Sequence, residues 1–222
     1  MSFRDRAVTY RDRTDAGERL ADHLAELDLH EPVVLALPRG GVPVAYEVAT
    51  RLRAPLDVVV ARKLGAPFQP ELGIGAVAEG GEPIYDEHLL RQLDLDEEAL
   101  DELVARERTE LERRVEHYRG ERALPELTGR DVLVVDDGLA TGVTARAALR
   151  ALRPHHPRRL LLAVPVGAPA SVDALASEAD EVICLQTPRS FAAVGQWYRD
   201  FEQTDDATVI DLLARARQDP GP

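Results

Sequence analysis

Two adjacent carboxylates, Asp136 and Asp137, stand at the end of an aliphatic run in the stretch VVDDGLATGVT (134–144), and a loop of small and hydroxyl residues follows them at once. Neighbouring negative charges repel each other, and burial at a strand end disfavours their ionised forms. The pair is therefore expected to serve a ligand, one that carries hydroxyl groups or a metal ion.

The loop after the acids has the residue types of an anion site. Gly138 permits an unusual turn, and a helix is predicted to open within 140–144. Free N–H groups and the positive end of the helix dipole meet at such a start, where Thr141 and Thr144 add hydroxyl donors and Gly142 allows close approach. A phosphate beside two acids fits a sugar phosphate. The alternative is an ordinary helix cap with two spare acids, although a cap needs only one such residue.

Two further segments, PRGG (38–41) and ARKLGAP (61–67), also follow predicted strands. Of 27 basic residues only Lys63 is a lysine, so this chain places a compact cation where it otherwise uses arginine. A lysine at this position suits a phosphate group. Chance remains the alternative for Lys63, as an ordinary tight turn does for PRGG.

Strands and helices alternate along the chain. Continuous apolar runs predict buried strands at 32–37, 57–61, 131–135, 159–166 and 181–185. Helical periodicity predicts helices at 14–27, 42–52, 86–119, 141–152, 171–178 and 207–218, and the glycine-rich segment 62–85 predicts a long loop, partly a β-ribbon. This pattern predicts an α/β fold with a parallel, doubly wound sheet, whose ligand lies where PRGG, ARKLGAP and DDGLATGVT meet, at the carboxyl ends of the strands.

The composition is that of a globular protein, with 222 residues of which 45% are hydrophobic and 30% charged. A net charge of −13 disfavours nucleic acid and anionic membranes as partners. No apolar run approaches the roughly 20 residues of a membrane helix. The N-terminus is too polar for a signal peptide, and a single cysteine, Cys184, excludes an internal disulfide. We expect a cytoplasmic protein without nucleic-acid or membrane partners.

Two common nucleotide-binding motifs are absent from the sequence. No GxxxxGK[ST] pattern of a P-loop occurs. The glycines of DDGLATGVT do not follow the dinucleotide-binding pattern, and GIGAVAEGG lies in a predicted loop with no helix after it.

The stretch VVDDGLATGVT resembles the PRPP-binding motif of the type I phosphoribosyltransferases, where PRPP is 5-phosphoribosyl-1-pyrophosphate. Four aliphatic-type residues, two acids and a small-residue TGxT loop carry the resemblance, which extends over residues 14–202. It implies one domain over 1–222, with a parallel-stranded, doubly wound α/β core at 14–186. A small hood and a C-terminal helix are implied at 187–218.

The resemblance assigns roles by position. Asp136 and Asp137 are expected to hydrogen-bond the ribose hydroxyls. The residues expected to bind the 5′-phosphate are Ala140, Thr141, Gly142, Val143 and Thr144. Those expected to bind the diphosphate are Arg39, Gly40, Gly41, Arg62 and Lys63. PRGG resembles the family's pyrophosphate loop, which usually contains a non-proline cis peptide, expected here at Arg39–Gly40, and 65–85 would be the mobile loop that closes over the reacting centre.

The implied reaction is attack of a nitrogen nucleophile on C1 of PRPP, with inversion and release of diphosphate. Its catalytic residues would be Arg39, Lys63, Asp136 and Asp137, because charge develops on both the ribose and the leaving group. Mg²⁺ is the implied cofactor. PRPP would hold most of it, with Asp136 or Asp137 reaching it through water, so no residue is assigned as a direct ligand.

The acceptor is expected to be a small nitrogenous molecule, a nucleobase above all, but its identity stays open. Ala140 stands where hypoxanthine-guanine relatives carry an aspartate that meets the purine ring, which disfavours a 6-oxopurine. Glu71 and Glu79, in the expected mobile loop, are candidates for a general acid or base.

Phe191 is the candidate to stack on the acceptor, since 191–198 resembles the base-stacking segment of purine transferases. The Val-Gly that follows is displaced by one residue from the family's pattern. The alternative is that Phe191, Trp197 and Tyr198 are core aromatics covering the end of the sheet.

Two hypotheses for the function remain open at this stage. The first is a Mg²⁺-dependent transferase that acts on PRPP as a homodimer. The second is a non-catalytic protein that senses PRPP or a nucleotide, for which PRGG and a basic pair at 62–63 would be unnecessary. A third idea, a phosphatase with Asp136 as nucleophile, lacks a second metal-binding acid at the usual spacing.

Overall fold

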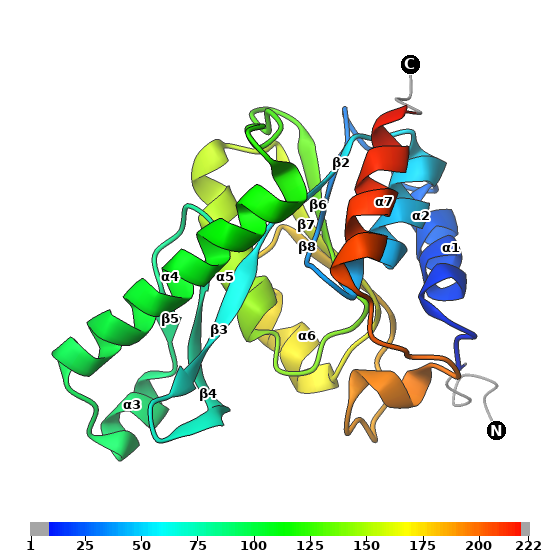
Figure 1. The fold of residues 1–222 in the computed structure, drawn as a ribbon. Helices are drawn as coiled ribbons and strands as arrows, with labels where there is room; N and C mark the ends of the chain where they lie inside the picture. The colour runs from blue at the N-terminus through cyan, green and yellow to red at the C-terminus, as the bar shows by residue number, and fades with distance from the viewer. Residues whose placement is uncertain (1–8, 219–222) are drawn as a thin grey trace.

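Five parallel strands form the central sheet in the order β2-β1-β6-β7-β8 (Figure 1). The strands are β1 (Val33–Ala36), β2 (Leu56–Val58), β6 (Asp131–Val135), β7 (Arg159–Val166) and β8 (Glu181–Gln186). The computed structural model describes residues 9–218 of the chain. Strands β1 and β6 are direct neighbours, with Leu35 opposite Val134. The loops after these two strands, PRGG and the acid pair, therefore begin side by side at the carboxyl edge of the sheet.

Helices cover both faces of the central sheet, as the sequence predicted (Figure 1). One face carries α1 (Arg13–Leu24), α2 (Gly41–Leu52) and α7 (Asp206–Gln218), and the other carries α5 (Val143–Leu152) and α6 (Pro169–Leu175). Alternate strand residues point to opposite faces, so Val34 and Leu133 pack with the first group while Val33 and Val132 pack with α5. Burial on both faces explains why these strands are continuously apolar.

A second, antiparallel sheet lies against α5, in the order β3-β4-β5. Its strands are β3 (Ala61–Ala66), β4 (Gln69–Ala78) and β5 (Ile84–Tyr85). The predicted loop at 62–85 is thus mostly strand, and the strand predicted at 57–61 already ends at Val58. The glycines suggested a loop, but they permit tight strand packing: a Cβ on Gly75 would overlap the carbonyl of Ile84.

The single helix predicted at 86–119 is two helices, α3 (Glu87–Leu93) and α4 (Glu97–Arg119). Asp94 ends α3 in the left-handed conformation, with φ of 48°. Asp96 then caps α4 by accepting a hydrogen bond from Ala99 N–H. Two short 3₁₀ turns, Arg153–His155 and Val194–Trp197, complete the elements. None of the helices within residues 9–218 is both long and apolar enough to cross a bilayer.

Candidate functional site

The acid pair lies at the carboxyl end of β6, where both side chains are half-buried. Asp136 Oδ1 accepts a hydrogen bond from Asp137 N–H at 2.8 Å. Asp137 Oδ2 accepts one from Arg13 Nε, also at 2.8 Å, and the Asp137 carbonyl accepts one from the Tyr198 hydroxyl at 2.5 Å. The two acids are therefore held differently, because Asp137 forms an ion pair with Arg13 and Asp136 forms none with residues 9–218.

The electrostatics of the pair oppose full ionisation. Burial raises the pKa of Asp136 well above its ordinary value, and the negative charge of Asp137 raises it further. Burial also raises the pKa of Asp137, against the lowering effect of the Arg13 guanidinium. A ligand that brings hydroxyl donors or a cation to this edge would favour the charged forms, so the site is suited to such a ligand.

The PRGG loop after β1 packs directly on the acid pair. A Cβ on Gly40 would overlap Asp137 Oδ2 and lie 2.8 Å from its Cγ, and one on Gly41 would lie 2.7 Å from the carbonyl of Val135. Both glycines are thus explained by close approach. The expected position of the cis peptide was wrong by one residue, since the cis bond is Pro38–Arg39.

Arg39 points from PRGG toward the C-terminal helix. Its Nη1 lies 3.9 Å from Asp206 Oδ1 at the start of α7, and the Tyr118 hydroxyl donates to the same carboxylate oxygen. The side chain is part-exposed, at 31%, so this pair leaves Arg39 free to turn toward a ligand at PRGG.

The loop 140–144 leads into α5 without a side-chain cap. Gly142 is the N-cap residue, with a left-handed φ of 72°, and no side chain in the described part of the chain, 9–218, caps the first N–H groups of the helix. Neither Thr141 nor Thr144 acts as the cap, so the ordinary-cap alternative is wrong. Leu139 fastens the loop to the end of β7 by donating to Val166 at 2.9 Å. The uncapped helix start is a ready site for a phosphate.

Arg62 and Lys63 lie in β3 and point in opposite directions, as consecutive strand residues do. Arg62 donates two hydrogen bonds to Glu107 of α4, at 2.7 and 3.0 Å. Lys63 donates to the Glu71 carbonyl at 2.7 Å and lines a cavity of about 750 Å³ together with Thr141. Of this predicted basic pair, only the lysine lines the cavity that contains Thr141.

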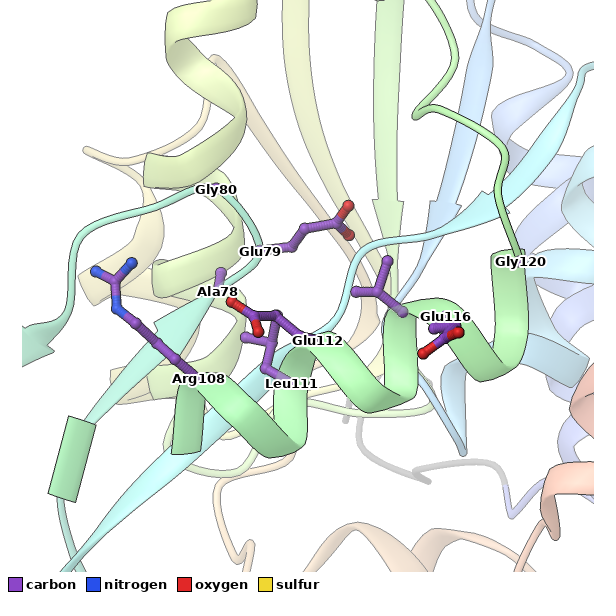
Figure 2. Close-up of a pocket in the computed structure, with 9 residues that line it drawn as sticks. Ala78, Glu79, Gly80, Arg108, Leu111, Glu112, Glu116 and Gly120 are labelled. Carbon is purple, nitrogen blue, oxygen red and sulfur yellow. The ribbon is translucent and has the colours of Figure 1, made fainter. Parts of the chain in front are cut away.

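The two candidates for a general acid or base occupy different surroundings. Glu79 is bound by the guanidinium of Arg119, which also contacts Asp57. Figure 2 shows Glu79 beside α4, where it borders a cavity of about 340 Å³. That cavity is lined by Ala78, Glu79, Gly80, Arg108, Leu111, Glu112, Val115, Glu116 and Gly120. Glu71 instead lines the cavity that reaches Thr141. Glu79 is held by Arg119, a partner that a general acid or base would not need.

Phe191 lies in the hood, nearly parallel to Trp197, with ring centroids 6.4 Å apart and an interplanar angle of 19°. It packs with Val194 on a buried cluster that contains Tyr10 and Tyr198. A Cβ on Gly138 would lie 2.5 Å from Val194, so the hood rests on the loop of the acid pair. Phe191 thus packs with the core aromatics, as the second alternative expected, while its stacking on an acceptor stays a prediction.

Sequence reasoning missed Arg13 and Tyr198 as neighbours of the acid pair. Arg13 is 124 positions from Asp137 along the chain, in the first turn of α1. Tyr198 was considered only as a core aromatic. No local pattern links residues so far apart, so the fold was needed to find them.

These features define an α/β protein whose sheet edge offers an anion site beside an acid pair and a glycine-rich loop. The profile of the phosphoribosyl transferase domain matches residues 10–201, close to the span of the resemblance. The chain belongs to the phosphoribosyl transferase domain family.

Two relatives illustrate the likeness. A Mycobacterium tuberculosis H37Rv protein named "Putative phosphoribosyl transferase Rv0571c" is 51% identical over 208 residues, which are 94% of this chain and 47% of that protein. This chain thus spans about half the length of the curated relatives it matches. The crystal structure of TT1426 from Thermus thermophilus is 48% identical with a TM-score of 0.80, and the match covers 94% of this chain and 99% of that one.

Proposed function

We propose that the protein transfers the 5-phosphoribosyl group of PRPP to a nitrogenous acceptor, a nucleobase above all, and releases diphosphate. One observation carries the proposal. An acid pair, an uncapped helix start and a glycine-rich loop meet at one edge of the sheet, with Gly40 packed on Asp137. Hydroxyls, a phosphate and a diphosphate are the three groups that such an arrangement recognises.

The residues of the site divide the substrate among them. The carboxylate of Asp136 accepts hydrogen bonds from the ribose hydroxyls, and the free N–H groups of 142–144 hold the 5′-phosphate. The amides of PRGG and the charge of Arg39 meet the diphosphate, and Lys63 adds a cation from β3. Arg62 is paired with Glu107. It contributes through its place in β3 and does not touch the ligand.

The bond changes balance as a displacement at C1. The acceptor nitrogen forms the C1–N bond, and the bond from C1 to the diphosphate oxygen breaks with its electron pair going to the diphosphate. The nitrogen's proton goes to solvent or to a carboxylate, for which Glu71 is the better placed of the two candidates. Fixed donors around the diphosphate stabilise its growing charge.

Mg²⁺ fits the donors that are present. Carboxylate oxygens suit this ion, and no cluster of three protein ligands occurs within residues 9–218. Because Mg²⁺ is often bound by one or two carboxylates together with substrate phosphates, Asp136 with PRPP can hold it. When bound, the ion neutralises charge on the leaving diphosphate.

The test is diphosphate release from PRPP and Mg²⁺ with a panel of nucleobases and simple amines. Release with one acceptor, lost in Asp136→Asn, would establish the reaction and its substrate. Binding of PRPP without release for any acceptor would favour a sensor of PRPP or a nucleotide. Absence of PRPP binding would contradict the proposal. Light scattering on the same sample tests the expected homodimer.

A further inference from the structure

The two acids of the site do not have equivalent surroundings. Asp137 Oδ2 receives Arg13 Nε at 2.8 Å, and both side chains of this ion pair are close to buried, at 12% and 13% exposure. Asp136, among residues 9–218, accepts a hydrogen bond only from the N–H of Asp137. One acid is thus anchored, and the other keeps acceptor capacity for a ligand.

Arg13 is itself held on three sides. Its Nη1 donates to the carbonyl of Glu202 at 2.7 Å, and its guanidinium lies 3.9 Å from the ring centroid of Phe201. A cation over an aromatic face is attracted by the ring, and the planar fork fixes both hydrogen bonds. Arg13 therefore joins the first turn of α1 and the segment after the hood to Asp137.

Gly40 places this junction against PRGG. A Cβ on Gly40 would overlap Asp137 Oδ2 and lie 3.4 Å from Arg13 Nε. A shift of Asp137 would therefore disturb the loop expected to bind the diphosphate. The position of the Asp137 carboxylate thus sets the spacing between the expected ribose subsite and the expected diphosphate subsite.

We propose that Arg13 is a positioning residue of the PRPP site, which anchors Asp137 against PRGG and leaves Asp136 as the carboxylate that meets the ribose. The proposal rests on the proposed function and deepens it. It separates the roles of two acids that the sequence treats alike, and it gives the N-terminal turn of α1 a part in ligand binding.

The experiment measures the Kd for PRPP with Mg²⁺ in a double-mutant cycle of Arg13→Ala and Asp137→Asn. Each single variant should weaken binding at least about tenfold, and the double variant little more than either, because both changes remove one interaction. Arg13→Lys should recover part of the affinity, since one ammonium keeps the charge but not the fork. Arg13→Lys also replaces Arg13→Ala in the test if the alanine variant does not fold.

Arg19→Ala is the matched control, because Arg19 lies in the same helix and makes a similar ion pair with Asp15. It should leave the Kd within about twofold of the wild type. Independent, additive effects of Arg13 and Asp137, or an Arg13→Ala variant with unchanged Kd, would overturn the proposal while PRPP binding stands. A wild-type protein that binds no PRPP would overturn the proposed function itself and this role with it.

Discussion

Asp136 illustrates at the residue scale how a site residue differs from a structural one. Its carboxylate is half-buried beside a second acid and has no ion-pair partner within residues 9–218. Burial and the charge of Asp137 raise its pKa, which means that its ionised form is costly in the folded protein. Such an arrangement does not stabilise the fold, which agrees with the ligand-binding role that we propose for Asp136.

Asp136→Asn should therefore strongly lower activity and raise the unfolding temperature. Activity should fall at least about 100-fold, since the amide offers fewer acceptors to the ribose and no charge to a cation. The folded state binds the Asp136 proton more tightly than the unfolded state. Wild-type stability therefore falls as pH rises from about 3.9, the unfolded carboxyl pKa, through the raised folded value.

The gain in unfolding temperature of Asp136→Asn should accordingly be absent near pH 3 and reach a plateau at high pH. Thermal scans of both proteins across pH measure it, and diphosphate release measures the loss of activity. A variant less stable than the wild type at neutral pH would refute this account of the acid pair.

Asp131, at the start of β6, is the opposite case. It is fully buried and accepts hydrogen bonds from Arg158, Arg159 and the N–H of His30. Burial alone would raise the pKa of Asp131, but the hydrogen bonds from Arg159 and Arg158 outweigh it and hold the pKa below its usual range. Its stabilising contribution is present above the unfolded pKa of about 3.9 and is lost as pH falls through the lower folded value.

Asp131→Asn should destabilise the protein by about 2 kcal/mol at pH 7 without altering the catalytic residues. This lies below the usual cost of breaking a buried pair, because both arginines are partly exposed. Urea unfolding measures the change. Asp211→Asn, in an exposed pair with Arg215, should change stability by less than about 0.5 kcal/mol and is the control.

At the scale of elements, the geometry of the site depends on the contact between two loops, PRGG and the loop of the acid pair. PRGG opens α2, and the acid pair follows β6 in the neighbouring strand position, so any atom added between them separates the subsites. The glycines of PRGG keep that space empty.

Gly40→Ala should weaken PRPP binding at least about tenfold, because its Cβ would displace Asp137 from Arg13. Gly129→Ala is the control: a Cβ there meets nothing within 4 Å, while a φ of 74° makes the change cost about 1 kcal/mol of stability. Calorimetric Kd and the unfolding temperature separate the two effects. Equal PRPP affinity in Gly40→Ala and Gly129→Ala would show that the space beside Asp137 is not needed.

The elements that the sequence predicted well are those whose signal is local. Buried parallel strands are continuously apolar, and the loops at their ends carry compact motifs, so the central sheet and DDGLATGVT were correctly located. The second sheet was largely missed, because Gly73 and Gly75 suggest a loop unless the partner strand is known. Arg13 was missed because its ion pair spans 124 positions.

Arg119 acts at the scale of the whole molecule, where it joins the two sheets. The side chain is almost fully buried at the end of α4 and bonds Asp57 and the Val58 carbonyl in β2 as well as Glu79 after β4. The central sheet and the β3-β4-β5 sheet thus share one buried cation. Lys63 belongs to the second sheet, so the same contact bears on how Lys63 lies relative to Thr141 in the cavity that both line.

Arg119→Ala should lower the free energy of unfolding by about 3 to 5 kcal/mol, since it leaves two carboxylates near the interface without their cation. Arg113→Ala, which removes an exposed arginine of α4 paired with Glu110, should have a far smaller effect. Hydrogen exchange distinguishes the consequences. If Arg119 holds the sheets together, exchange in β3, β4 and β5 should rise in Arg119→Ala before exchange in β1 and β6 does.

Equal acceleration of both sheets in Arg119→Ala would mean that they open as one unit, with the cation contributing only to global stability. The predicted order of hydrogen exchange, in which the second sheet opens first, has a functional consequence. A loosened second sheet would move Lys63 away from Thr141, so diphosphate release should fall while PRPP binding through Asp136 and the start of α5 is largely kept. An equal loss of PRPP binding and of diphosphate release would instead mean that Arg119 affects the whole site.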